Sequence, residues 1–149
     1  MEAHMGSEGE DAMNEQQFLA PDASRVQIKL VVLECPLSVC KFEKLPDGLL
    51  DCGFCCVART EEELSVVCET ARVPKGTIAR EDGWRAFKVQ GPLDFGLVGI
   101  LAKISAALAD ADVPLFAIST YDTDYVLVKE QRLKVAIDAL REYGCDVVG

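Results

Sequence analysis

The sequence predicts an α+β protein in which short strands alternate with two amphipathic helices. Apolar residues recur at three- and four-residue spacings over about 96–111 and 130–143, which is the period of a helix with one buried face. Short apolar runs bounded by Gly, Pro, Asp or Glu recur elsewhere, as is typical of strands. The apolar pattern of residues 54–69 returns at 115–130, an offset of 61, which indicates two related units.

The chain begins with a segment that shows neither period. Residues 1–24 hold six carboxylates and no Lys or Arg, and they are expected to form a disordered acidic tail. His4, the only histidine of the chain, lies in this tail. Its position argues against most histidine-based catalysis and most histidine-ligated metal sites.

The next segment, residues 25–82, is expected to form a first, degenerate unit. Its predicted strands cover residues 25–33, 37–42, 54–60 and 64–69, and residues 44–53 form a loop with at most one helical turn. Pro74 and Gly76 stand where the second unit has a helix, because proline removes a backbone donor and glycine disfavours a fixed helical backbone.

The remaining residues, 83–149, are expected to form the more regular unit. Asp94 is a candidate N-cap of the first helix, and Gly144 is expected to end the second in a left-handed conformation. In order, the predicted elements are a strand at 84–90, a helix at 96–111, strands at 113–120 and 125–129, a helix at 130–143 and a strand at 145–148.

This order matches a split β-α-β unit of the ferredoxin-like kind, in which the third strand lies antiparallel between the first two. The end of strand one, the start of the helix and the turn after strand two then share one edge, which collects Gly91–Gly99 and Ser119–Asp124. Helix N-termini offer free N–H groups and partial positive charge for a carboxylate, and Asp122 and Asp124 suit an ammonium group. The edge therefore complements both charges of a free amino acid.

The strand at 113–120 is apolar at successive positions, without the alternation expected of a sheet that faces water on one side. The second face of the sheet must therefore be covered too. Either the other unit or another chain is expected to cover it.

Several of these segments resemble the ACT domain, a small regulatory module that binds amino acids. The family's Gly-Ile pair stands at Gly99-Ile100, its S-T-Y-x-T-D turn at Ser119–Asp124, and its T-x-x-E-L-S-V-V-C pattern at Thr60–Cys68. The resemblance is close over about residues 83–148 and extends over 25–82. It is to short tandem ACT proteins related to CASTOR-type arginine sensors and to aspartate kinase regulatory domains.

The resemblance implies two ferredoxin-like βαββαβ units with antiparallel sheets, the first degenerate. It implies a non-catalytic, allosteric sensor of a small amino acid, with no cofactor, that acts as a homodimer or through a protein partner. The acidic surroundings are compatible with a cationic ligand such as arginine or lysine. The residues expected to contact the ligand are Asp94, Gly99, Ile100, Ser119, Thr120, Thr123 and Asp124.

Two other functions stay open. A protein-protein interaction module without a small-molecule ligand fits the same pattern if Asp94 merely caps a helix and residues 119–124 form an ordinary turn. An acylphosphatase-like hydrolase is suggested by Val89-Gln90-Gly91, but that chemistry needs a fixed cation, and no Lys or Arg stands between Lys88 and Lys103. We therefore expect no enzymatic activity.

The cysteines include one C-x-x-C, Cys52 to Cys55, for which Cys35 and Cys40 are a poorly spaced second pair of zinc ligands. A redox dithiol is expected at a helix start, whereas Cys55 and Cys56 lie in a predicted strand. We expect the cysteines to pack as small buried hydrophobes, with no metal bound.

Composition narrows the partners and the compartment. The 25 carboxylates against 15 Lys and Arg argue against nucleic acid and anionic membranes as main partners. No signal peptide is visible, no apolar run approaches the roughly 20 residues of a membrane span, and seven cysteines without secretory context suit a reducing compartment. We expect a cytoplasmic protein.

Overall fold

The computed structural model describes residues 27–90 and 99–149. The predicted tail, residues 1–24, and Asp94 lie outside these ranges. In chain order the described elements are β1 (Lys29–Val32), β2 (Leu37–Phe42), the 3-10 turn η2 (Leu49–Asp51), β3 (Cys55–Arg59), β4 (Leu64–Glu69), η3 (Thr70–Arg72), β5 (Ala79–Val89), α2 (Ile100–Asp110), β6 (Phe116–Ser119), β7 (Asp124–Lys129), η4 (Glu130–Arg132), α3 (Leu133–Glu142) and β8 (Asp146–Val148).

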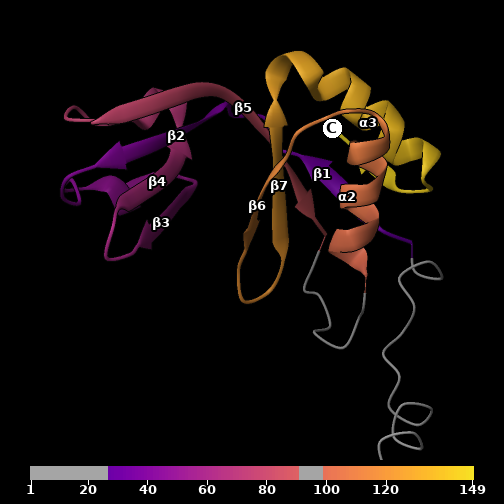
Figure 1. Ribbon diagram of the computed structural model, residues 1–149, viewed down its shortest axis with the longest axis horizontal. Helices are drawn as coiled ribbons and strands as arrows, with labels where there is room; N and C mark the ends of the chain where they lie inside the picture. Colours follow the sequence, from indigo (N-terminus) through magenta and orange to yellow (C-terminus); the bar gives the residue numbers. More distant parts are fainter. Residues whose placement is uncertain (1–26, 91–98) are drawn as a thin grey trace, which may run out of the picture.

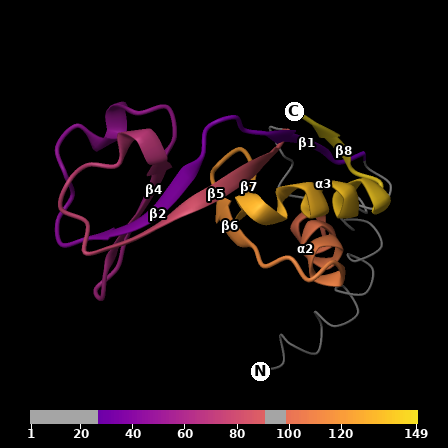
Figure 2. The ribbon, with the colours of Figure 1, turned by 90° about the horizontal axis from the view of Figure 1, so that it is seen from above.

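β5, with 11 residues, is the strand that joins the two halves of the molecule. Its first residues pair antiparallel with β2, where Arg80 is the partner of Cys40. Further along, Phe87 is the antiparallel partner of both Val32 in β1 and Val126 in β7. The eight strands of the described part consequently belong to one sheet, and β5 runs lengthwise between its halves (Figures 1 and 2).

The second half of the sheet has the strand order β8-β1-β5-β7-β6. β7 lies antiparallel between β5 and β6, which confirms the predicted split β-α-β arrangement. β1 lies between β5 and β8, although by sequence it falls in the predicted first unit. The sequence could not show this pairing, because an apolar run identifies a strand but not its neighbours.

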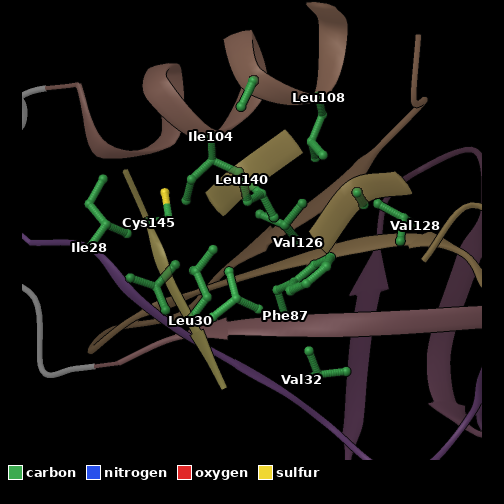
Figure 3. Packing of buried hydrophobic residues seen from close by; sticks show 14 of the residues in the cluster. Ile28, Leu30, Val32, Phe87, Ile104, Leu108, Val126, Val128, Leu140 and Cys145 are labelled. Carbon is green, nitrogen blue, oxygen red and sulfur yellow. The ribbon is translucent and has the colours of Figure 1, made fainter. Parts of the chain in front are cut away.

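A single apolar core joins this half of the sheet to α2 and α3. Ile104 and Leu108 of α2 and Leu140 of α3 point towards Phe87 and Val126 on the sheet (Figure 3), and all five side chains are completely buried. Each such burial stabilises the fold by about 1.5–3 kcal/mol. The buried helix faces that the apolar spacing predicted within 96–111 and 130–143 are thus confirmed.

The first half, in the order β3-β4-β2 with the start of β5, has a smaller core and, among residues 27–90, no α-helix. The turn η2 covers this core by placing Leu49 over it. The first half, as described, thus lacks the two helices that cover the second half. The buried residues of this smaller core are Cys40, Phe42, Leu49, Leu64, Val66 and Cys68.

A third cluster lies between the two halves. Leu37 of β2 and Val67 of β4 pack with Ala86 of β5, Ile118 of β6 and Leu127 of β7, and all five are buried. The helix-free face of the second half is thus covered in part by the first half. The continuous apolar run of 113–120 predicted that either the other unit or another chain covers this face. The other unit covers part of it.

Three details of the prediction were wrong. β5 begins at Ala79, five residues before the expected Trp84, because its first residues pair with β2. The second predicted helix starts with the 3-10 turn η4, so α3 begins only at Leu133. The repeat has an offset of 60 and not 61, since β4 matches β7 and η3 matches η4 at that spacing. β4 and β7 each contain three consecutive apolar residues, so their apolar patterns still match when the alignment is shifted by one residue. The positions of the paired strands fix the offset at 60.

Candidate functional site

The candidate site lies at one edge of the second half, where β5 ends, α2 begins and the β6–β7 turn reverses the chain (Figure 1). The hydroxyl of Thr123 in the turn donates a hydrogen bond to the carbonyl oxygen of Val89, the last residue of β5. Thr123 is only 6% exposed. Its buried side chain therefore fixes the turn beside the end of β5, 34 positions away in the sequence.

Hydrogen bonds between two threonines hold the turn itself. The Thr120 N–H donates to the Thr123 carbonyl at 2.8 Å, and the Thr120 hydroxyl accepts from the Thr123 N–H at 3.3 Å and donates to the Thr123 carbonyl at 3.0 Å. Threonine is suited to this role because its hydroxyl can bond to nearby backbone groups. The turn is therefore held in one conformation before any ligand arrives.

Ser119 and Asp124 close the strand pair at the base of this turn as register partners. Ser119 is exposed and Asp124 is half-buried. No ion pair of Asp124 is found among residues 27–90 and 99–149. The Asp124 carboxylate thus stands at the edge without a cation from the described part of the chain.

Gly99, with a φ of 90°, is the N-cap of α2. The sequence predicted Asp94 for this role, and Asp94 lies outside the described residues. Glycine adopts this left-handed conformation without the steric cost that a Cβ brings. The side chain of Ile100 points into the core and is 7% exposed, so only its backbone faces the edge. Gly99 and Ile100 can therefore serve a ligand only through backbone groups.

The predicted site residues differ in what they can bind. Backbone N–H groups at the start of α2, with its partial positive charge, suit an anion, and Asp124 suits a cation. The Thr120 hydroxyl already bonds within the turn and the Thr123 hydroxyl already bonds to the Val89 carbonyl, so they position the site more than they offer it contacts. In the sequence, only the spacing of Thr120 and Thr123 could have indicated that their hydroxyls hold the turn in place. Asp94 lies outside the described residues.

The cysteines do not form a second site of this kind. All seven are free, and Cys52, Cys55, Cys40 and Cys68 pack together in the core of the first half. Burial, with smaller effects from neighbouring thiols, raises the pKa of Cys68 to about 12 and that of Cys55 to about 11. These thiols are therefore protonated at neutral pH and behave as apolar packing groups.

Metal ligands do not gather in the described part of the chain. Within 27–90 and 99–149, no group of three or more His, Cys, Asp or Glu side chains is arranged to hold a metal ion. No helix in the same ranges is long and apolar enough to cross a bilayer.

Part of this chain is similar in sequence to known proteins. The profile of the ACT domain matches residues 79–142. A segment of 59 residues is 41% identical to the cytosolic arginine sensor for mTORC1 subunit 1 of Rattus norvegicus, and 39% identical to the Homo sapiens protein of the same name. The segment is 39% of the present chain and 18% of each sensor, so the similarity concerns a small part of those proteins.

Solved structures extend the similarity over most of the chain. A structural-genomics target from Agrobacterium tumefaciens is 31% identical with a TM-score of 0.75, over 83% of this chain and 93% of that one. Aspartate kinase of Clostridium acetobutylicum, described as an allosteric enzyme, shares the fold at 14% identity with a TM-score of 0.59, over 78% of this chain and 34% of the kinase. With the βαββαβ topology of its second half and the ACT profile across β5 to α3, residues 79–142 of this chain match the ACT domain.

Proposed function

We propose that this protein is a non-catalytic regulatory protein that binds a free amino acid at the edge between α2 and the β6–β7 turn. The observation that carries the proposal is the bond from Thr123 to Val89, which sets a turn bearing Asp124 beside the end of the strand that leads to α2. The ligand carboxylate then meets the backbone N–H groups that follow Gly99, and its ammonium group meets Asp124.

The ligand class rests on this charge pairing and on the relatives. Asp124 and the exposed Asp122 leave the edge acidic, which suits an amino acid with a cationic side chain such as arginine or lysine. The rat and human relatives are named as arginine sensors. Their description as cytosolic supports a cytoplasmic location for this protein.

Regulation follows from differential binding. A ligand shifts a conformational equilibrium only by the difference between its affinities for the two states. We propose that the site closes at an interface, with a second copy or a protein partner, and that residues 25–82 act as scaffold for the binding unit at 83–149. Such a role needs no catalytic group.

The experiment is a thermal-shift screen of the full chain against the twenty amino acids, followed by calorimetric titration. One or a few amino acids should raise Tm with concentration, as ligand binding to the folded state requires. Asp124→Asn should abolish the rise with a cationic amino acid such as arginine or lysine, whereas Asp146→Asn, at an exposed aspartate of the outer strand β8, should leave it unchanged. An equal loss in both variants would contradict the assigned site.

An interaction module without a ligand is the second candidate, because three strands offer an open edge. In the described part of the chain, β3 pairs only with β4, β6 pairs only with β7, and β8 pairs only with β1. Unpaired edges are templates for another chain. A screen in which no amino acid raises Tm, together with partner binding that Pro substitutions in β6 abolish, would favour this candidate.

A further inference from the structure

A cavity of about 320 Å³ opens between the two halves, on the face of the sheet opposite to the helices. Lys88 and Tyr125, which are direct register partners in β5 and β7, line it from the second half. Their face is set by alternation, since Phe87 and Val89 point into the helix-side core, whereas Ala86 packs between the halves. The volume lies within the usual range of small-molecule sites, roughly 300–1,000 Å³.

The first half supplies the opposite wall. Phe54, just before β3, packs edge-on against Tyr125, with ring centroids 5.0 Å apart and an interplanar angle of 78°. Gly53 and Glu69 lie beside Phe54 on this wall, and Leu37 lines the cavity from β2. The cavity therefore exists only because the two halves meet, and it has both apolar and charged walls.

Two opposite charges face this cavity without neutralising each other. Lys88 and Glu69 both line it, yet no ion pair within 4.0 Å joins them or involves either one among residues 27–90 and 99–149. Glu69 instead accepts a hydrogen bond from the Gly53 N–H at 3.3 Å. This one bond leaves further acceptor positions on the Glu69 carboxylate, which can accept several hydrogen bonds.

We infer that this cavity is a second ligand site, which takes a small zwitterion with an apolar side chain. Its carboxylate pairs with Lys88 and its ammonium group pairs with Glu69, while the exposed Glu34, which also lines the cavity, adds negative charge. Leu33, Leu37 and the rings of Phe54 and Tyr125 receive the apolar part. An amino acid such as leucine has this combination of groups.

This site is distinct from the edge site at α2, although the two share strands. Lys88 and Tyr125 are the immediate neighbours of Val89 and Asp124, but successive side chains of a strand point to opposite faces. Loss of one site therefore leaves the other's side chains in place. Ligand binding in the cavity is thus independent of the function proposed for the edge.

The test is a titration of the ¹⁵N-labelled full chain with L-leucine, and with two analogues that each lack one charge, L-leucinamide and 4-methylpentanoate. L-leucine should cause saturable shifts at the backbone amides of Gly53 and Phe54 at millimolar or lower concentrations. Each analogue should bind at least about tenfold more weakly, since each leaves one charged partner unpaired. Equal affinities for all three, or no saturable shift at these amides, would overturn the inference.

The same spectra separate this inference from the proposed function. Leucine shifts confined to Gly99, Ile100 and residues 119–124 would place binding at the edge alone, which overturns the cavity site and supports the edge site. Shifts at Gly53 and Phe54 that persist in Asp124→Asn would support the cavity site whether or not the edge binds a ligand.

Variants complete the test. Lys88→Gln and Glu69→Gln should each weaken L-leucine binding at least about tenfold, whereas Lys134→Gln and Glu142→Gln, at exposed positions of α3, should leave it unchanged. The double reversal, Lys88→Glu with Glu69→Lys, should recover part of the affinity because it restores both charges. Unchanged binding in both single variants, with the urea midpoint also unchanged, would contradict the inference.

Discussion

The hairpins β3–β4 and β6–β7 share a turn but lead into different segments. In the first, the Thr60 N–H donates to the Glu63 carbonyl at 2.9 Å and its hydroxyl accepts the Glu63 N–H at 3.1 Å, as Thr120 does with Thr123. A 3-10 turn comes after each hairpin, η3 and η4. Only η4 continues into an α-helix.

The difference lies in two residues after the shared turn. At the offset of 60, Pro74 corresponds to Lys134 and Gly76 to Ala136, both within α3. Proline breaks a helix because it lacks the N–H and its ring crowds the preceding turn, and glycine costs about 1 kcal/mol relative to alanine. The same hairpin therefore ends in a helix or in a loop according to a few positions beyond it.

The prediction with the largest expected effect compares the hydrophobic cores of the two halves. Leu140→Ala, at a fully buried position of α3, should lower the free energy of unfolding by about 4 kcal/mol, because α3 and the sheet hold open the space left by the lost side chain. Leu49→Ala, in the turn that covers the smaller core, should cost about 2 kcal/mol, because a 3-10 turn collapses more easily. Urea unfolding at constant m measures both, and a greater cost for Leu49→Ala would reverse the ranking.

A second test concerns Gly83 in β5 and Gly144 after α3, with φ of 85° and 91°. A Cβ would meet no atom within 4 Å at either position, so the cost of alanine comes from the backbone alone. Gly83→Ala and Gly144→Ala should each cost about 1–2 kcal/mol. Gly144→Asn should cost about half as much, because asparagine tolerates this conformation better. Alanine variants as stable as the natural chain would refute the conformational explanation.

A third test uses the buried thiols of the smaller core. The folded-state pKa of Cys68, about 12, lies above its ordinary value of 9.0, so its contribution to stability is complete below pH 9 and is lost as pH rises towards 12. Between pH 9 and 10 this amounts to about 1 kcal/mol. Cys68→Ala should reduce the slope of unfolding free energy against pH by that amount, and an unchanged slope would contradict the assignment.

The smallest effect is expected where the halves join. Lys129 lies 4.8 Å from the ring centroid of Trp84, donates to the Asp82 carbonyl at 2.9 Å and lies 3.4 Å from a Glu81 oxygen. Lys129→Gln should cost about 0.5–1 kcal/mol and alter the fluorescence of Trp84, the only tryptophan. Lys134→Gln, with its exposed pair to Asp138, should cost less than about 0.5 kcal/mol and leave the fluorescence unchanged.

Local pattern predicted most elements but not their partners. The hairpins, the apolar stripe of α2 and the left-handed Gly144 follow from residue spacing, and the structure confirms them. The position of β1 beside β8, the early start of β5 and the cavity at Lys88 depend on contacts between segments far apart in the sequence. For the site, spacing predicted that the turn lies at the end of β5. It did not predict that the Thr123 hydroxyl donates a hydrogen bond to the Val89 carbonyl or that Gly99 is the N-cap of α2.

The position of β1 limits where this protein can be truncated without exposing strand edges. A fragment that starts at Gly83 would retain both helices but lose the strand that fills the space between β5 and β8. Two bare rows of peptide groups would then face solvent, and such rows invite aggregation. Expression trials should therefore keep Lys29–Val32 attached, or supply that strand as a separate peptide, to obtain soluble material.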